Sequence, residues 1–442
     1  MQDTTFRPNH MEIRWHDYTA DVRDEPITRA PLPAKASVVG RTGLMLLSCG
    51  TGAWRVRSSM NTIAEALGLI CSADIGLTSI EYTCFDGRHA FTQTLTLITT
   101  GVNTSKLNRL ENFTAEFTEK CSHLSGEEIH RQLDQIEQVH GLYSPLMLGL
   151  AAALACGAFT FLLGGGWVEM MLAFFGAGIG NAIRCKLGKH HLTLFPCITV
   201  SVASACLVYA GCLKLAEALF AVNTQHEAGY ICSMLFIIPG FPFITSGIDM
   251  AKLDMRSGLE RMGYSVMIVL VAALAAWLMA LILHLTPVDF LSLDLGTAEK
   301  IVFRLIASFC GVFGFSIMFN SPPALAAAAA GIGAVCNTFR LELVDLAAFP
   351  PAAAAFCGAL AAGLLASLYK KHAGFPRIAI TVPSIVIMVP GLYLYRAIYN
   401  LGVMNLTVSA SWFASAALII AALPMGLIFA RVMTDRMFRC CT

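Results

Sequence analysis

The pattern of hydrophobic and polar residues changes character at about residue 145. From Pro145 onward the chain consists of apolar segments of about 20 residues, the length that an α-helix needs to cross about 30 Å of hydrocarbon. The pattern therefore predicts a polytopic α-helical membrane protein with about ten transmembrane helices. The predicted spans are 146–163, 167–187, 193–216, 229–250, 262–285, 301–319, 322–339, 346–369, 378–399 and 408–430.

The first third of the chain has a different pattern, which predicts a soluble domain. Residues 1–37 are polar, with prolines near their end, and predict a flexible N-terminal arm. Residues 38–144 combine apolar positions at helical spacing with two alternating runs that are rich in Thr and Ile. Asp86-Gly87 separates these runs and is a strong signal for a hairpin. The pattern predicts an N-terminal soluble α+β domain with helices at 53–69, 107–123 and 125–139 and strands at 73–85 and 90–100.

Charged residues follow the same division. Of the 59 Lys, Arg, Asp and Glu residues, 30 lie before residue 144. A central Asp, Lys or Arg costs about 2.5–3.5 kcal/mol in a transmembrane helix, so the sparse charge of the remaining chain fits lipid-facing segments. With the N-terminal domain in the cytoplasm, the inner loops hold twelve Lys and Arg residues and the outer ends hold four. The positive-inside rule thus predicts a cytosolic N-terminal domain and a cytosolic C-terminus.

Composition argues against several other function classes. The net charge is +1 and no basic patch accumulates, so we expect no nucleic-acid partner. The chain lacks a Walker A motif, so ATP is not expected as a direct fuel. The 15 cysteines are scattered without metal-ligand spacing, which predicts reduced, packed thiols. The polar start predicts no signal peptide. We therefore expect neither a metal nor another cofactor.

The membrane part repeats itself along the chain. Residues 175–180 recur at 328–333 with an offset of 153, and residues 237–240 recur at 388–391 with an offset of 151. If each half crosses the membrane five times, the second half enters from the opposite side. The sequence thus predicts two inverted five-helix repeats, a design in which one site is exposed alternately to either face. The two predicted repeats are 145–290 and 291–442.

Each repeat carries a Pro-Gly pair inside a predicted span. Proline removes a backbone donor and glycine permits a bend. Irregular backbone at membrane depth occurs where protein or a wet cavity surrounds it, and a helix that restarts there presents N–H groups suited to a carboxylate. A simple packing kink is the alternative for either pair alone. The candidate substrate-binding residues are Pro239, Gly240, Thr245, Ser246, Pro390, Gly391, Tyr395 and Arg396.

Ionisable residues within the spans are the second indication of a site, because they are expensive there and usually face a cavity. Asp249 and Glu169 are the candidates for proton coupling. Arg396 is the candidate partner of a substrate carboxylate, and we expect it to face the same cavity as Asp249 near the membrane midplane. An interfacial position, with the charged group in water, is the alternative for each residue.

Several of these segments resemble the threonine/serine exporter family. Residues 46–68 are similar to the family's opening helix, with a Gly, an Arg-Val pair and a closing Leu-Gly, and residues 107–136 are similar to its closing soluble helices. Gly164-Gly-Gly-Trp167, Pro239-Gly240 followed by Asp249, and residues 389–396 continue the resemblance, which covers roughly 40–405. The chain departs from the family at 72–81, which lacks a Pro-Thr pair, and at His130, where a small residue is usual.

The resemblance implies a secondary transporter in the bacterial inner membrane. It exports small amino acids (threonine or serine) or small carboxylates, and the proton motive force drives it; relatives that split the repeats are implicated in succinate export. The expected partners are a small-molecule substrate and the lipid bilayer, and a homo-oligomer stays open. A passive channel of the same architecture is one alternative. A membrane-tethered enzyme or sensor, acting through the N-terminal domain, is another.

Overall fold

The chain divides into two compact units. The computed structural model describes residues 13–139, 141–190, 192–220, 224–287, 289–290, 293–373 and 376–440. One unit comprises Met1–His140 together with Lys252–Glu260, and the other comprises Gly141–Ala251 and Arg261–Thr442. The boundary at 140–141 lies close to Pro145, where the long apolar segments of the sequence begin. The assignment of Lys252–Glu260 to the first unit is new, because the sequence placed this segment in a membrane loop.

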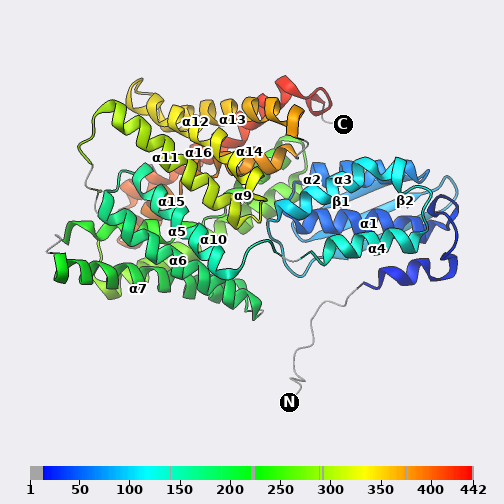
Figure 1. The fold of residues 1–442 in the computed structure, drawn as a ribbon, viewed down its shortest axis with the longest axis horizontal. Coiled ribbons are helices and arrows are strands. Elements are labelled where there is room, and N and C mark those ends of the chain that lie inside the picture. Colours follow the sequence, from blue (N-terminus) through cyan, green and yellow to red (C-terminus); the bar gives the residue numbers. More distant parts are fainter. Residues whose placement is uncertain are drawn as a thin grey trace, which may run out of the picture. The chain divides into compact units, whose positions relative to one another are not determined.

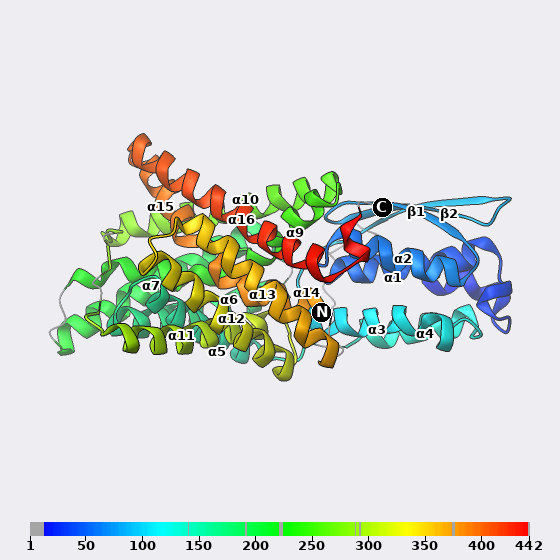
Figure 2. The same ribbon diagram turned by 90° about the horizontal axis from the view of Figure 1, so that it is seen from above.

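The first unit is built in three layers. An antiparallel sheet in the order β1-β2-β3 lies on one side of α1 and α2, and α3 and α4 lie on their other side (Figure 2). The bounds of its elements are η1 (Trp15–Val22), η2 (Ile27–Arg29), α1 (Leu32–Ser48), α2 (Ala53–Ala66), β1 (Ile70–Ile75), β2 (Ser79–Phe85), β3 (Ala90–Thr96), α3 (Thr104–Lys120) and α4 (Gly126–Glu137). The mixed composition of the predicted α+β domain is therefore confirmed.

Local signals of the sequence explain where these elements begin and end. Asp86 and Gly87 form the turn between β2 and β3, where the Asp86 carboxylate accepts backbone N–H bonds from residues 88 and 89 at 2.8 and 2.7 Å. Ser125 and Glu128 form a reciprocal capping box at the start of α4. The run 73–85 was predicted as one strand, but it contains the turn between β1 and β2, so the sheet has three strands.

The predicted flexible arm, 1–37, differs from the structure over its described part. Thr19 and Ile27 are fully buried, and the Ile27 N–H donates to Leu124 O at 2.8 Å. Helix α1 already begins at Leu32. Pro26 precedes the short helix η2 and Pro31 precedes α1, so both fix the backbone at a helix start, and the apolar Ile27 supplies the burial that orders the segment.

Residues Lys252–Glu260 are held in the first unit by charged side chains. Arg57 Nη2 donates to Asp254 Oδ1 at 2.5 Å, and Arg256 forms an ion pair with Asp74. Glu260 Oε2 accepts the backbone N–H of Leu77 at 2.6 Å. These contacts explain why Lys252–Glu260, which includes the first turns of the helix that begins at Met255, belongs to the first unit.

The second unit is a bundle of long apolar helices. Eight described helices are long and apolar enough to cross a membrane, and two bent helix pairs raise the number to ten if each pair is one span. This multi-pass architecture confirms the predicted membrane class (Figure 1). Its elements are α5 (Pro145–Leu162), α6 (Trp167–Lys189), α7 (Leu194–Phe220), η3 (Thr224–Gly229), α8 (Tyr230–Ser233), η4 (Leu235–Ile237), α9 (Gly240–Ala251), α10 (Met255–Leu283), α11 (Thr297–Met318), α12 (Pro323–Asp345), α13 (Pro351–Ala373), α14 (Arg377–Ile385), η5 (Val386–Met388), α15 (Gly391–Gly402), α16 (Leu406–Thr434) and η6 (Met437–Arg439).

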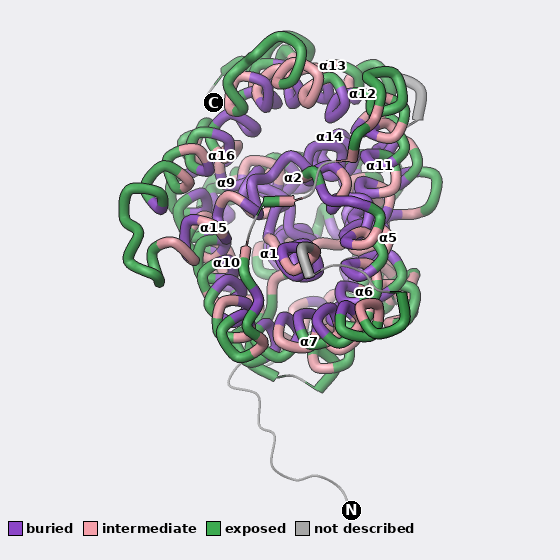
Figure 3. The backbone as a smooth tube through the Cα atoms, turned by 90° about the vertical axis from the view of Figure 1, so that its left-hand side faces the viewer, coloured by how far each residue is buried: buried purple, intermediate pink, exposed green. Residues whose placement is uncertain are grey.

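Small residues set the distances between these helices. A Cβ atom added to Gly149 of α5 would lie 2.9 Å from Gly178 O of α6, and one added to Gly426 of α16 would lie 2.6 Å from Phe356 O of α13. Such backbone-to-backbone approach is the usual way in which membrane helices gain packing energy. Buried residues gather on the inward sides of the helices, and exposed apolar residues cover the outside (Figure 3).

Candidate functional site

Both Pro-Gly pairs interrupt a helix. The helical stretches His226–Ile237 and Gly240–Ala251 meet at an angle of 55°, and Arg377–Met388 and Gly391–Gly402 meet at 45°. The break falls at Pro239-Gly240 in the first pair and at Pro390-Gly391 in the second. The prediction that these dipeptides mark broken helices is therefore confirmed.

The two breaks contact each other in a reciprocal manner. A Cβ atom on Gly240 would lie 2.5 Å from Val386 Cγ2 and 3.3 Å from Val389 Cγ2. A Cβ atom on Gly391 would lie 3.0 Å from Leu235 Cδ2 and 3.1 Å from Ile238 Cγ1. Val386, Val389 and Gly391 follow Leu235, Ile238 and Gly240 by the same offset of 151 residues. The glycine at each break therefore contacts the same two equivalent positions of the other break.

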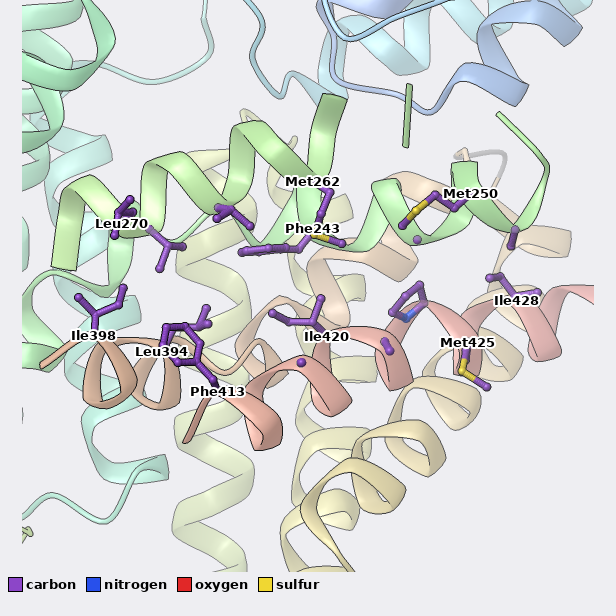
Figure 4. A pocket seen from close by; sticks show the side chains of 17 residues that line it. Phe243, Met250, Met262, Leu270, Leu394, Ile398, Phe413, Ile420, Met425 and Ile428 are labelled. Carbon is purple, nitrogen blue, oxygen red and sulfur yellow. The ribbon is translucent and has the colours of Figure 1, made fainter. Parts of the chain in front are cut away.

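The half-helices that follow the breaks run in opposite directions. Figure 4 shows Phe243 and Met250 along α9 and Leu394 and Ile398 along α15, with the two chain directions opposed. Asp249 lies nine residues after Gly240, near the end of α9, and Arg396 lies five residues after Gly391 on α15. That Asp249 and Arg396 face one cavity stays a prediction.

Asp249 forms a buried ion pair on its own side of the crossing. Its Oδ2 atom lies 3.2 Å from Nε of Arg261 in α10, and both side chains are almost completely buried. Thr245 and Ser246 are fully buried on the same half-helix. Their hydroxyls donate to carbonyls of α9 itself, Thr245 to Phe241 O at 3.1 Å and Ser246 to residue 243 at 2.8 Å.

Arg396 lies near the other end of the crossing. Its Nη2 donates to Oδ1 of Asp289 at 2.9 Å, while its guanidinium carbon lies 5.1 Å from the centre of the Trp412 ring. The Asp289 carboxylate is almost fully exposed, so this ion pair is weak in water. The buried Nε of Arg396 has no hydrogen-bond partner among the described residues. A further acceptor, such as a carboxylate, would satisfy it.

Glu169 pairs with a histidine that the sequence analysis did not single out. Glu169 Oε1 lies 2.8 Å from Nδ1 of His226, and Oε2 accepts the backbone N–H of Gly166 at 3.0 Å. Tyr209 donates to His226 O at 2.6 Å and so fixes the backbone that carries the imidazole. The carboxylate is buried, with 1% of its side chain exposed. The signal for His226 was its place at the head of an apolar span, three residues before the predicted start at 229.

A tyrosine pair links the two broken helices. The hydroxyls of Tyr230, on α8 before the first break, and Tyr395, on α15 after the second, lie 2.5 Å apart. Both side chains are fully buried. Tyr395 was predicted as a substrate contact, and Tyr230 was missed because its partner lies 165 residues away in the chain. The pair places two hydroxyls inside the bundle and connects the elements on either side of the two breaks.

The first unit holds a buried histidine in a polar cluster. His130 Nε2 lies 3.0 Å from Ser37 Oγ, and Arg41 Nη1 donates to His130 O at 3.1 Å. Burial and the Arg41 charge lower the pKa of His130 to about 3, so the imidazole is neutral. The second ring nitrogen faces Arg41 at 3.5 Å instead of a carboxylate. A serine-histidine pair without an acid to orient the base does not match a hydrolase triad, so we interpret the cluster as structural.

A second histidine, His16 of η1, contacts two carboxylates of α4 in the same unit. His16 lies 3.0 Å from a carboxylate oxygen of Glu127 and 2.9 Å from one of Asp134. The hydrogen bond with Glu127 raises the pKa of His16, and Asp134 adds to the effect. In the described part of the chain, no three His, Cys, Asp or Glu side chains form a group that could hold a metal ion.

Comparisons with known proteins found related sequences along most of the chain. Two profiles of the threonine/serine exporter family match this chain, one over residues 37–284 and one over residues 304–433. A protein of Escherichia coli named "Probable succinate transporter subunit YjjP" is 26% identical over 242 residues, which cover 53% of this chain and 91% of that protein. The "Probable threonine/serine exporter" of Mycobacterium tuberculosis is 24% identical over 385 residues, covering 82% and 69%.

A third relative has a lower sequence identity to this chain. The "Pheromone-regulated membrane protein 10" of Debaryomyces hansenii is 22% identical over 286 residues, which cover 60% of this chain and 26% of that protein. No solved structure matches the chain.

Proposed function

The chain belongs to the threonine/serine exporter family, and from that membership we propose that it exports a small amino acid or a small dicarboxylate in exchange for protons. The substrate site in this proposal lies at the crossing of the two broken helices. Relatives carry names that refer either to threonine and serine or to succinate. Both kinds of substrate share a carboxylate, and the site must recognise that group first.

The reciprocal contact of the two breaks is the observation that carries the proposal. When two equivalent surfaces contact each other so that residue i of one meets residue j of the other and the reverse, a two-fold axis relates them. The order of elements agrees, since both halves contain three long helices, a broken helix whose second half has 12 residues, and a final helix of 29 residues. Together with the opposed directions of α9 and α15, this supports inverted repeats and alternating access about the crossing.

The start of each second half-helix offers backbone donors for a carboxylate beyond its first residue, because the N–H groups of Gly240 and Gly391 already donate to Ile238 O and Val389 O at 2.8 and 2.9 Å and Pro242 has no N–H. The first N–H groups of a helix have no partner within it, and the helix dipole adds a partial positive charge. In α9 and α15 these starts lie beside the opposite break, deep in the bundle. Tyr230 and Tyr395 add hydroxyls, and Arg396 adds a guanidinium whose Nε lacks an acceptor among the described residues. A carboxylate at this crossing would therefore meet neutral donors and one cation.

Glu169 is the better of the two proton-coupling candidates. Asp249 is paired with Arg261, and a guanidinium does not release its proton in proteins, so only one member of that pair can titrate. Glu169 is paired with His226, so its buried partner is an imidazole, a type of side chain that can exchange a proton, instead of a permanently charged guanidinium. We assign proton coupling to the Glu169–His226 pair and a positional role to the Asp249–Arg261 pair.

Counterflow in proteoliposomes tests the proposal. Vesicles that contain the purified chain are loaded with unlabelled threonine, serine or succinate, and uptake of the labelled compound is followed with and without a pH gradient. We expect saturable exchange of one class of compound, with net export only when protons can move inward. Glu169→Gln should retain exchange and lose the response to the gradient. Non-saturable flux that ignores a trans substrate would instead favour a passive channel and would refute the transporter mechanism.

A further inference from the structure

Two cysteines lie opposite each other on the first two strands of the sheet. Cys71 of β1 and Cys84 of β2 are direct partners in the antiparallel register. Ala73 and Tyr82, the next pair on the same side of the sheet, are both buried, and Tyr82 donates its hydroxyl to Ala36 O of α1 at 2.9 Å. Because side chains alternate along a strand, both thiols lie on this face, which packs against the helices (Figure 2).

The hydrogen bonds of the hairpin show that the two cysteines form a close pair. The Gly76 N–H donates to Ser79 O at 2.8 Å, so residues 76 and 79 are a hydrogen-bonded pair at the turn. Hydrogen-bonded and non-hydrogen-bonded pairs alternate along an antiparallel ladder, and Cys71 lies an odd number of steps from residue 76. Cys71 and Cys84 are therefore a non-hydrogen-bonded pair, whose Cα atoms are typically about 4.5 Å apart. A disulfide spans about 4.4–6.8 Å between Cα atoms, so the backbone can accept the bond as it stands.

The two thiols differ in exposure and in acidity. Cys71 is partly exposed on an edge strand, whereas Cys84 is fully buried. The hydrogen bond between the two thiols lowers the pKa of Cys71 and raises that of Cys84. Burial raises the pKa of Cys49, in the same unit, to about 12. The thiolate is the nucleophilic form, so Cys71 is the thiol of this pair that reacts first.

We propose that Cys71 and Cys84 form a reversible redox site that reacts with a small-molecule disulfide. The Cys71 thiolate attacks one sulfur of that disulfide, forms a mixed disulfide and releases one small thiolate. Cys84 then loses its proton to the released thiolate and attacks the Cys71 sulfur, which forms the Cys71–Cys84 bond and releases the second small thiolate. Two protein thiols are oxidised, and one small disulfide is reduced to two thiols.

The bond would tie together the open end of the β1–β2 hairpin. The other end of this hairpin contacts Lys252–Glu260 through Asp74 and the backbone N–H of Leu77. A disulfide stabilises mainly by restricting the unfolded chain, so oxidation should make the first unit harder to unfold. The site is independent of which substrate the protein carries, because none of the proposed substrate contacts belongs to the hairpin.

Mass spectrometry tests the site in the full-length protein. The purified chain is reduced, freed of reductant and incubated with oxidised glutathione, and the remaining thiols are blocked with iodoacetamide before trypsin digestion. Residues 58–88 form one tryptic peptide, in which Cys71 and Cys84 are the only cysteines. We expect this peptide to lose two hydrogen atoms and to carry no alkyl group, and dithiothreitol should reverse the change. The oxidised protein should melt about 5 °C or more above the reduced protein.

A register-shifted variant is the matched control. Cys84→Ala combined with Thr83→Cys keeps the number of cysteines but moves the second thiol to the other face of the sheet, so the bond should form at least about tenfold more slowly. Cys84→Ser should stop at the mixed disulfide between Cys71 and glutathione, and Cys71→Ser should leave Cys84 unmodified. Size-exclusion profiles identify variants that fail to fold, and the unchanged protein tests the bond without them.

Three results would each overturn the proposal. The first is alkylation of both Cys71 and Cys84 after treatment with oxidised glutathione. The second is equally fast closure in the register-shifted variant, which would show that the pairing seen in the sheet is irrelevant. The third is a bond that persists in a large excess of reduced glutathione, because such a bond would be permanent instead of reversible.

Discussion

Alanine at position 240 would place a methyl carbon into the crossing of the two broken helices. That carbon would lie 2.5 Å from Val386 Cγ2, whereas carbon atoms in contact prefer about 3.5–4.0 Å, so one element must move by roughly 1 Å. Overpacking of this kind costs about 1–3 kcal/mol. Alanine regains at most about 1 kcal/mol through helix propensity. We therefore expect Gly240→Ala to destabilise the protein by about 1–2 kcal/mol and to slow exchange.

The equivalent change in the other repeat should be milder. A methyl carbon at Gly391 would lie 3.0 Å from Leu235 Cδ2, so a shift of a few tenths of an ångström relieves the contact. Gly391→Ala should thus be close to neutral in stability. Val386→Ala removes the carbon that Gly240→Ala meets, so the double variant should recover most of the lost stability. Gly263→Ala, which meets no atom within 4 Å, is the control.

Thermal unfolding in detergent and counterflow rates in proteoliposomes measure these effects together. The reasoning predicts a ranking in which Gly240→Ala is worst, Gly391→Ala is intermediate and Gly263→Ala is harmless. It also predicts that Val386→Ala rescues the first variant and not the second. If Gly240→Ala and Gly263→Ala unfold at the same temperature and exchange substrate at the same rate, the close reciprocal crossing does not exist.

Three further predictions follow from described contacts. Arg261→Gln should cost about 3–5 kcal/mol in unfolding experiments because it removes the buried guanidinium that pairs with Asp249, and combining it with Asp249→Asn should restore part of the loss. The pKa of His130 is lowered from 6.5 to about 3, so between these two pH values the unfolded chain binds a proton that the folded chain does not bind. The stability of the protein should therefore fall as the pH drops below 6.5. Thermal melting at pH 7.5 and 5 should show a smaller fall for His130→Gln than for the unchanged protein. The predicted orientation places the partly exposed Cys71 and the exposed Cys440 in the cytoplasm. A thiol reagent that cannot cross the inner membrane should therefore label them only after the cells are permeabilised. Labelling in intact cells would contradict this orientation.

Local signals of the sequence predicted local structure well. The Asp86-Gly87 turn and both Pro-Gly breaks lie where the residue types require them, because glycine and proline act on the backbone within a few residues. The apolar runs predicted the long helices for a similar reason, since length and hydropathy alone decide whether a helix fits a membrane. These features need no information about distant parts of the chain.

Pairings between distant residues were beyond the reach of the sequence. Tyr230 and Tyr395 are 165 residues apart, and only Tyr395 was among the predicted site residues. Arg57 and Asp254 are separated by 197 residues, and nothing in either neighbourhood names the other. Coulombic attraction is similar for any Arg and Asp, so spacing and charge alone could not select these partners.

The segment Lys252–Glu260 determines how separable the soluble domain is. A domain that is joined to the remaining chain by one linker can be removed by cutting that linker. Here the chain passes between the two units at 140–141, at 251–252 and again at 260–261. A truncation before Gly141 would therefore strip Asp254, Arg256 and Glu260 of the partners described above, directly after the half-helix that carries Asp249. In terms of modularity, the first unit is a discontinuous domain whose two segments are interleaved along the chain with those of the second unit.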